Sequence, residues 1–534
     1  MANTAPPVDQ KELFGHPIGL FILFFTEMWE RFSYYGMRAI LVLYLVSATT
    51  EGNAGLGWSQ PEALALYGWY TMLVYVVSIP GGILADKVFG QKKAVLIGGI
   101  ILVIGHGILA VEEMWAFYSG LGLIIAGVGL LKPNISTMVG GLYREGDIRR
   151  DKGFTIFYIG INLGAFLSSL IVGTVGEVYG WHYGFGLAGI AMALGLLVYL
   201  WGQKYLTNVG NLLSKVERDE GASLGNMFTD LFRSPMQLVI TMILLAVSLW
   251  GMYALGIAYG LLFIFLTLVV AMMMMVYKDL TSQVMKDRYV VMLLSFILVI
   301  VFWGAFEQAG GLMNIYALDK TDRTIPFNLP FGIGAEVPAS WFQSLNAMFI
   351  ILFGVLVANF WARRKLKNKE ASSIFKMATG VIIMGLGFVF MVFAAMEFES
   401  SGASAMYWLV LAYLLHTIGE LCSSPVALSF ITKLSPAKYA SLMMGVYFAA
   451  TGLGNKVAGE LGAFASEAGD IAIFLGITIF TVAFASIVLL MLKPLKRLTH
   501  GAEDHEGELP QQENFELSDE ELVVEKKDKI PPRN

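Results

Sequence analysis

Long apolar stretches separated by short polar connections run through almost the whole chain. A helix needs about twenty mostly apolar residues to cross the hydrocarbon core of a membrane. This pattern predicts an all-α polytopic membrane protein with fourteen spans, arranged as six, then a pair, then six. The predicted spans cover residues 15–49, 63–86, 93–111, 115–141, 153–178, 183–204, 233–253, 256–277, 289–316, 339–362, 374–396, 405–433, 439–465 and 471–493.

The same pattern divides the chain into segments. The pair of spans between the two sets of six has almost no charge in its interior, which predicts a peripheral hairpin outside any polar pathway. The charged C-terminal stretch is typical of a disordered tail. The predicted segments are a cytoplasmic N-terminus (1–14), a six-helix bundle (15–204), a cytoplasmic linker (205–232), the hairpin (233–277), a second six-helix bundle (278–495) and a cytoplasmic tail (496–534).

Basic residues are distributed unequally between the two sets of loops. If residue 1 is cytoplasmic, the loops on the outer side contain only Lys320 and Arg323, and the other loop Lys and Arg residues lie on the inner side. Cytoplasmic loops of membrane proteins carry such an excess. We therefore expect both termini inside, and we find no pattern of a cleaved signal peptide at the start.

Composition supports this class and excludes others. The chain is 56% hydrophobic and only 14% charged, its mean hydropathy is +0.66, and its net charge is −5. No basic tract or nucleic-acid motif is present, so we expect no nucleic-acid partner. The single cysteine, Cys422, excludes an intrachain disulfide and a cysteine-based metal site. We expect no metal and no cofactor.

The first span contains a polar stripe that a lipid-facing helix would not carry. A charged side chain at the centre of a bilayer costs at least ~2.5–3.5 kcal/mol on insertion scales. The stripe residues recur at spacings that place them on one face of a helix, and their charges sum to zero. They are Glu27, Glu30, Arg31, Tyr34, Tyr35 and Arg38. The stripe predicts a water-filled cavity, although a purely structural ion-pair cluster is the alternative.

Other spans add polar and aromatic residues to such a cavity. The first bundle contributes the cations Arg38 and Lys132, and the second contributes the acids Glu307 and Glu420. A zwitterion with separated charges fits this distribution, and acids that gain and lose a proton could control whether a cation is paired. The further candidates are Tyr75, Asn162, Trp303, Asn346 and Ser424. The two amides could instead join helices, and we interpret Tyr67 as a packing or interfacial residue.

Several motifs together resemble the proton-dependent oligopeptide transporters of the major facilitator superfamily. TEMWERFSYYG (26–36) resembles that family's first signature, and FYIGINLG (157–164) resembles its second. FEQAGG, WFQSLN and GELCSSP resemble its seventh, eighth and tenth spans, and the loop GGILADKVFGQKKA (81–94) resembles the superfamily's loop signature. The resemblance implies two six-helix halves around a central cavity, with an extra hairpin typical of bacterial members.

The resemblance also implies roles for matching residues. Glu27, Glu30 and Arg31 would take part in proton coupling, and Glu307 would pair with Arg38 and titrate during gating. Arg38 and Lys132 would receive the peptide C-terminus, and Glu420 would receive its N-terminus. The remaining pocket positions would be Tyr34, Tyr35, Tyr75, Asn162, Trp303, Asn346, Ser424 and Tyr447.

Two positions depart from the family pattern. Ala165 stands where the second signature usually has serine, and Tyr447 stands where a tryptophan is expected. The second departure affects a pocket wall and hence the side-chain preference.

We therefore predict a proton-coupled importer of di- and tripeptides, functional as a monomer in the lipid bilayer of a bacterial cytoplasmic membrane. Another zwitterion or an anion such as nitrate is the alternative cargo, although nitrate has no need of an acid at Glu420. A membrane enzyme would need a nucleophile with its base, or a metal motif, and a channel would need a repeated pore motif. We find none of these features in the sequence.

Overall fold

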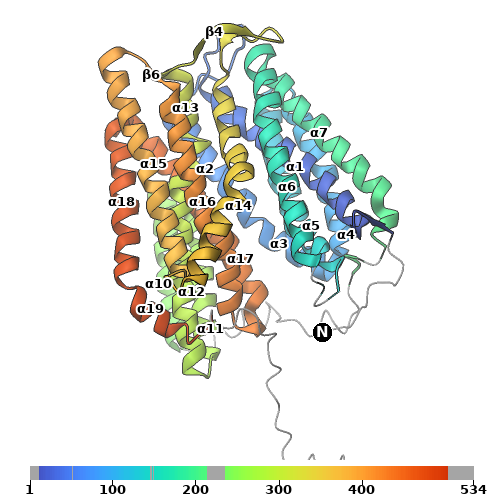
Figure 1. The fold of residues 1–534 in the computed structure, drawn as a ribbon, viewed down its shortest axis with the longest axis vertical. Helices are drawn as coiled ribbons and strands as arrows, with labels where there is room; N and C mark the ends of the chain where they lie inside the picture. Colours follow the sequence, from blue (N-terminus) through green and yellow to red (C-terminus); the bar gives the residue numbers. More distant parts are fainter. Residues whose placement is uncertain are drawn as a thin grey trace, which may run out of the picture.

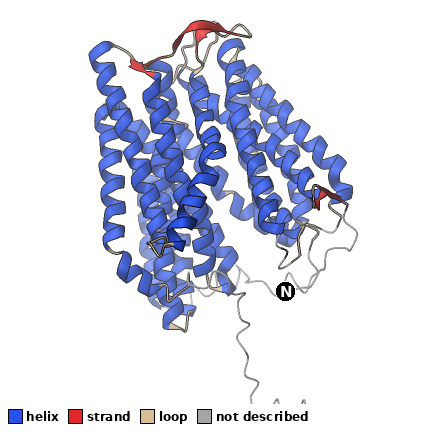
Figure 2. Cartoon of the chain, in the orientation of Figure 1, coloured by secondary structure: helices blue, strands red, loops and turns tan. Residues whose placement is uncertain are grey.

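The computed structural model describes residues 11–502 apart from 51, 145–146, 148, 208 and 213–234. These residues form a bundle of long helices with a few short strands (Figures 1 and 2). The first half of the chain contains α1 (Ile18–Val46), α2 (Gln60–Val76), α3 (Ser78–Leu84), α4 (Gln91–Leu109), α5 (Met114–Gly141), α6 (Arg149–Thr174) and α7 (Trp181–Gly202).

The hairpin and the second half follow the linker. The hairpin is α10 (Pro235–Leu255) and α11 (Ile257–Asp279). The second half contains α12 (Gln283–Phe306), α13 (Leu312–Asp319), α14 (Ser344–Leu366), α15 (Ser373–Ser401), α16 (Met406–Leu434), α17 (Ala440–Ala468), α18 (Asp470–Leu490) and α19 (Leu492–Leu498). The predicted fold class, six helices plus a hairpin plus six helices, is confirmed. The predicted linker lies largely outside the described residues, and the tail lies outside them from residue 503 onwards.

The strands are short and lie at the ends of the bundle (Figure 2). Three two-stranded sheets form, pairing β1 with β2, β3 with β6 and β4 with β5. The strands are β1 (Glu12–Leu13), β2 (His16–Pro17), β3 (Thr321–Asp322), β4 (Thr324–Leu329), β5 (Gly334–Glu336) and β6 (Ser404–Ala405).

The helices are long enough to cross a membrane. Eleven helical segments of the described chain qualify by length and apolar composition alone. Helices α1 and α17 are not among these eleven, although each is 29 residues long, and α10 contributes only the shorter apolar helix Leu245–Leu255. In α1 the charges of the polar stripe account for this. The protein is therefore a multi-pass membrane protein.

Local sequence signals set several helix ends. Ser59 and Glu62 form a capping box at the start of α2, in which each side chain accepts a hydrogen bond from the other residue's backbone N–H. At the end of α15, Gly402 has φ 84°, a left-handed conformation that glycine adopts without steric cost. These signals fix where α2 begins and where α15 ends.

Each half packs as its own bundle, and two helix pairs make the most extensive contacts between the halves. Helix α1 packs on α6 and α7 in the first half, and α15 packs on α16 and α18 in the second. Between the halves, α2 runs along α17 and α6 along α14. Glycines bring α2 and α17 together, because a Cβ atom added to Gly68 would lie 3.0 Å from the Cα atom of Gly459.

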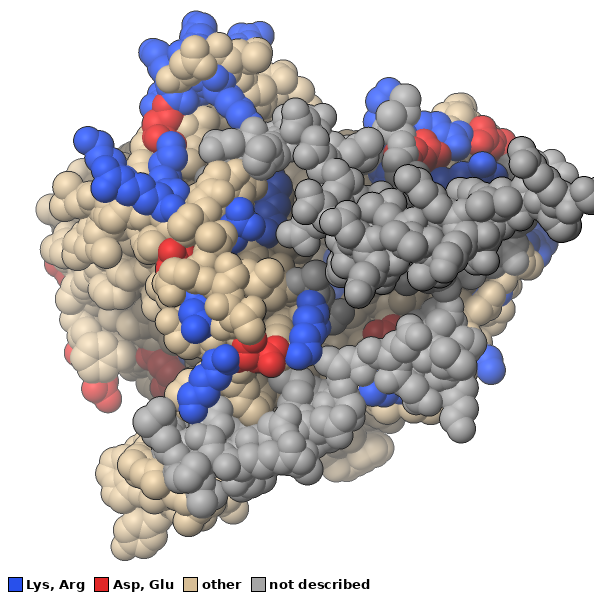
Figure 3. Space-filling view, turned by 90° about the horizontal axis from the view of Figure 1, so that it is seen from below, with Lys and Arg blue, Asp and Glu red and all other residues tan. Residues whose placement is uncertain are grey.

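Polar contacts also join the halves at the end where β4 and α13 lie, the upper end of Figure 1. The side chains of Asn314 and Gln343 both donate hydrogen bonds to the carbonyl oxygen of Ala39, at 2.9 and 3.2 Å. Figure 3 shows the opposite, lower end, where lysine and arginine side chains outnumber acidic ones on the visible surface.

Candidate functional site

The polar stripe of α1 contains a compact charge cluster. The Nε atom of Arg31 lies 2.7 Å from Glu27 Oε1 and 2.8 Å from Glu30 Oε2. All three side chains are almost fully buried, with 2%, 0% and 3% of their residues' surface exposed for Glu27, Glu30 and Arg31. Two carboxylates share one guanidinium here, which leaves an excess negative charge that a proton or another cation can compensate.

Lys132 of α5 supplies the nearest additional cation. Its Nζ atom lies 3.8 Å from the centre of the Tyr75 ring, a cation–π contact between α5 and α2. The ammonium group also lies within electrostatic range of the α1 cluster, where Arg31 repels it and Glu30 and Glu27 attract it. Lys132 is only partly buried, so its charge is available to a ligand next to the α1 cluster.

A second charge cluster joins the two halves. Arg38 Nη1 lies 3.1 Å from Glu307 Oε1, and the hydroxyl of Tyr67 donates a 2.6 Å hydrogen bond to the same oxygen. The guanidinium of Arg38 also lies 5.2 Å from the centre of the Tyr35 ring. Our interpretation of Tyr67 as a packing residue was therefore incomplete, because its buried hydroxyl is a direct partner of Glu307.

Glu420 of α16 is held by a neighbour in its own half. The side-chain amide of Asn346 donates hydrogen bonds to Glu420 Oε2 at 2.7 Å and to Thr417 Oγ1 at 3.2 Å. Asn346 is on α14, and both it and Glu420 are partly buried. This contact fixes the direction of the carboxylate.

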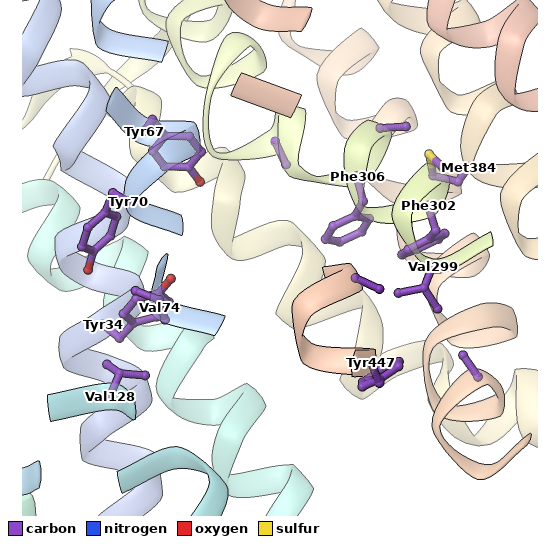
Figure 4. Close-up of a cluster of buried hydrophobic side chains, with 14 of the residues drawn as sticks. Tyr34, Tyr67, Tyr70, Val74, Val128, Val299, Phe302, Phe306, Met384 and Tyr447 are labelled. Carbon is purple, nitrogen blue, oxygen red and sulfur yellow. The ribbon is translucent and has the colours of Figure 1, made fainter. Parts of the chain in front are cut away.

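Aromatic side chains flank these charges on both halves. Tyr34 stacks on Tyr70 with ring centres 6.5 Å apart, and Trp303 lies edge-on to Phe306 at 5.3 Å. Figure 4 shows Tyr34, Tyr67 and Tyr70 on one side, and Phe302, Phe306 and Tyr447 on the other, with the second group contributed by α12 and α17.

Two of the predicted polar residues make less distinctive contacts. Asn162 is buried on α6 and donates its amide to the carbonyl oxygen of Tyr158 at 2.9 Å, within its own helix. Ser424 is partly buried on α16, one turn after Glu420, and its side chain forms a hydrogen bond with that of Tyr447 on α17.

The sequence reasoning missed an ion pair on α17. Lys456, only 3% exposed, pairs with Glu460, and its Nζ atom lies 4.2 Å from the centre of the Trp69 ring of α2. The hydroxyl of Tyr259 in the hairpin donates a 2.7 Å hydrogen bond to Glu460. The sequence does carry a signal for this pair, because a lysine lies four residues before a glutamate within a predicted span.

No metal site appears in the part of the chain that the structure describes. No group of three or more His, Cys, Asp or Glu side chains is placed there to hold an ion.

Comparison with known proteins gives one consistent result. The chain is 40% identical over 503 residues to the uncharacterized transporter YclF of Bacillus subtilis. The match covers 92% of this chain and 97% of that one. It is 34% identical to the peptide transporter YePEPT of Yersinia enterocolitica over 92% of this chain and 97% of that one. It is also 34% identical to a di-/tripeptide transporter of Lactococcus lactis, over 92% and 98%.

Solved structures agree with these relatives. A peptide transporter POT in complex with sulfate superposes with a TM-score of 0.76 at 36% identity, covering 92% of this chain and 97% of that chain. A POT family transporter in complex with 5-aminolevulinic acid gives a TM-score of 0.76 at 33% identity, covering 91% and 99%. The sequence profile of the POT family matches residues 92–493. This chain belongs to the POT family of transporters.

Proposed function

We propose that this protein is a proton-coupled symporter that imports di- and tripeptides. The observation that carries the proposal is the placement of opposite charges on the two halves. Arg38 and Lys132 lie on the first half, and Glu420 lies on the second, held by Asn346. Relatives named as peptide and di-/tripeptide transporters, each 34% identical, support the same cargo.

A short peptide can use both sets of charges at once. Its carboxylate would meet the cations of the first half, and its amine would meet Glu420. Charge-assisted hydrogen bonds are roughly twice as strong as neutral ones, so the termini would dominate the binding energy. Side chains would contact the walls formed by Tyr34, Trp303 and Tyr447, with little demand on their identity.

Proton coupling would act through the two buried charge clusters. A proton on Glu307 would remove the charge that holds Arg38, and the free guanidinium could then bind a peptide carboxylate. Glu27 and Glu30 share Arg31, so a proton on either acid would neutralise the excess negative charge of that cluster. Binding of a proton and binding of a peptide would thereby favour each other.

Transport would proceed by alternating access, with the two halves rocking around the central site. The excess of basic residues at the lower end supports placing that end in the cytoplasm, with both termini there. One chain contains both halves and therefore the whole site, which supports a functional monomer in the cytoplasmic membrane of a bacterium.

The cargo is tested by peptide uptake into vesicles that contain purified protein. We expect uptake of radiolabelled dialanine to be inhibited by unlabelled dialanine and far less by its N-acetylated or C-amidated forms. Glu420→Ala should raise the KM for dialanine about tenfold or more, the scale of one lost charged contact. Glu467→Ala, at an exposed position of α17, serves as the control.

Two results would contradict the peptide assignment. One is equal inhibition by free and N-acetylated dialanine, which would remove the role of Glu420 as amine acceptor. The other is uptake of nitrate with no uptake of any peptide, which would favour the anion cargo.

A further inference from the structure

Glu177 forms a polar contact between the halves that lies away from the central charges. It is in the last turn of the α6 segment, in residues Val175–Tyr179 that continue the helix. Its carboxylate accepts hydrogen bonds from the backbone N–H groups of Ala339 and Ser340, at 2.8 and 2.9 Å, and from the hydroxyl of Ser340 at 2.5 Å. All three donors belong to the second half, in the turn Ala339–Gln343 before α14.

Hydrogen bonds within the first half hold the backbone of Glu177 in place. The side-chain amide of Asn53 donates to the carbonyl oxygens of Gly176 and Glu177, at 2.8 and 3.1 Å. The Oδ1 atom of Asn53 accepts a hydrogen bond from the backbone of Trp181, at the start of α7. The carboxylate is therefore presented by a fixed piece of backbone, and a movement of the halves would pull directly on its three hydrogen bonds.

Neighbouring contacts close the same junction. The indole N–H of Trp341 donates to Thr174 Oγ1 at 2.8 Å, and the hydroxyl of Tyr179 donates to the carbonyl oxygen of Phe331 at 2.5 Å. A Cβ atom on Gly173 would collide with the side chain of Ser340, so the two backbones approach closely here. The junction lies at the upper end of the molecule, where α6 meets the segment leading into α14 (Figure 1).

The donors that face Glu177 depend on it. The N–H groups of Ala339 and Ser340 open a helical turn, where backbone N–H groups have no partner within the helix. A carboxylate has lone pairs for all three donors, and a bond to an ionised acceptor is about twice as strong as a neutral one. A neutral amide in its place offers one acceptor oxygen and turns an NH₂ group towards further donors.

We propose that Glu177 is the latch of the upper gate, the residue that holds the first and second halves together when the central site is closed on that side. The proposal rests on the alternating access described above and adds a residue to it. Opening towards the upper side must break all three hydrogen bonds of Glu177, whereas opening towards the lower side leaves them intact. The latch therefore favours the state in which the upper end is shut.

The test measures the distance between the upper ends of the halves by double electron–electron resonance. Spin labels would be attached at Tyr183, on α7, and at Tyr407, on α16, which are 70% and 52% exposed. Cys422 is buried and would be replaced by serine in all samples. The full chain would be studied in lipid nanodiscs without peptide.

We expect Glu177→Gln to raise the ratio of long to short distances about tenfold, the change that follows from the loss of one charged hydrogen bond. Ser340→Ala removes one donor and should give a smaller rise. Glu177→Asp keeps the charge on a shorter side chain, and its ratio of long to short distances should fall between those of Ser340→Ala and Glu177→Gln. Glu113→Gln, an exposed acid in the loop before α5, should leave the distances unchanged.

Unchanged distances in Glu177→Gln, with the variant folded and monodisperse, would overturn the latch. If that variant does not fold, unchanged distances in both Ser340→Ala and Glu177→Asp would overturn it. Because the measurement needs no peptide, its failure is separate from failure of the proposed cargo, which the uptake assay reports.

Discussion

At the scale of single residues, the most informative contact is the one that Tyr67 makes. The sequence identified Arg38 and Glu307 as isolated opposite charges on different halves, and the family resemblance predicted that they pair. Neither line of reasoning gave Tyr67 a polar role, because one tyrosine in an apolar span looks the same whether it packs or donates. Its 2.6 Å hydrogen bond to Glu307 makes the cluster a contact of three side chains.

The closeness of Gly310 to this cluster gives a prediction. A Cβ atom at Gly310 would collide with the Tyr67 hydroxyl and lie 3.1 Å from Arg38 Nε. We expect Gly310→Ala to displace the hydroxyl from Glu307 and to lower the kcat for peptide uptake about tenfold or more, because positioning errors of about 1 Å are this costly. Uptake kinetics in vesicles would measure the change.

Gly476→Ala is the matched control, because a Cβ atom there meets nothing within 4 Å. Wild-type uptake by Gly310→Ala would show that the Tyr67 contact has no part in transport.

At the scale of helices, the polar stripe of α1 was predictable and the position of the hairpin was not. Residues at helical spacing share a face by geometry, so the sequence placed Glu27, Glu30 and Arg31 together correctly. Which helices an apolar hairpin packs against depends on tertiary contacts that no local pattern records. The structure places Tyr259 of α11 beside Trp69 of α2 and Glu460 of α17, at the line where the two halves meet.

This helix contact predicts an asymmetric response to mutation. Glu460→Ala would leave the buried ammonium of Lys456 without its ion partner. Breaking a fully buried pair costs about 3–5 kcal/mol, but the Glu460 side chain is 44% exposed, so we expect roughly 1–2 kcal/mol and a lower Tm. Lys456→Met combined with Glu460→Ala should recover most of the loss, because it removes the stranded charge.

Thermal unfolding in detergent would measure these variants, with Glu467→Ala as the exposed control. A Tm of Glu460→Ala equal to that of the wild type, or no recovery in the double variant, would rule out this account of the pair.

At the scale of the whole molecule, the number and order of helices followed from hydropathy and loop charge. Span length is fixed by the membrane, and this constraint makes such a count possible from sequence. The contacts that close the upper end were not predictable, because Glu177 looks like an ordinary glutamate near the end of a span. Its partners Ala339 and Ser340 lie more than 160 residues further along the chain.

The most direct test of the account compares gradient-driven uptake with exchange in vesicles containing wild type or Glu27→Gln. We predict that an inside-alkaline, inside-negative gradient makes the wild type accumulate dialanine above its outside concentration. Glu27→Gln should lose accumulation and still exchange labelled for unlabelled peptide, because the proton site changes and the peptide site remains. Accumulation by the wild type that is unaffected by collapsing the proton gradient would contradict proton-coupled peptide symport.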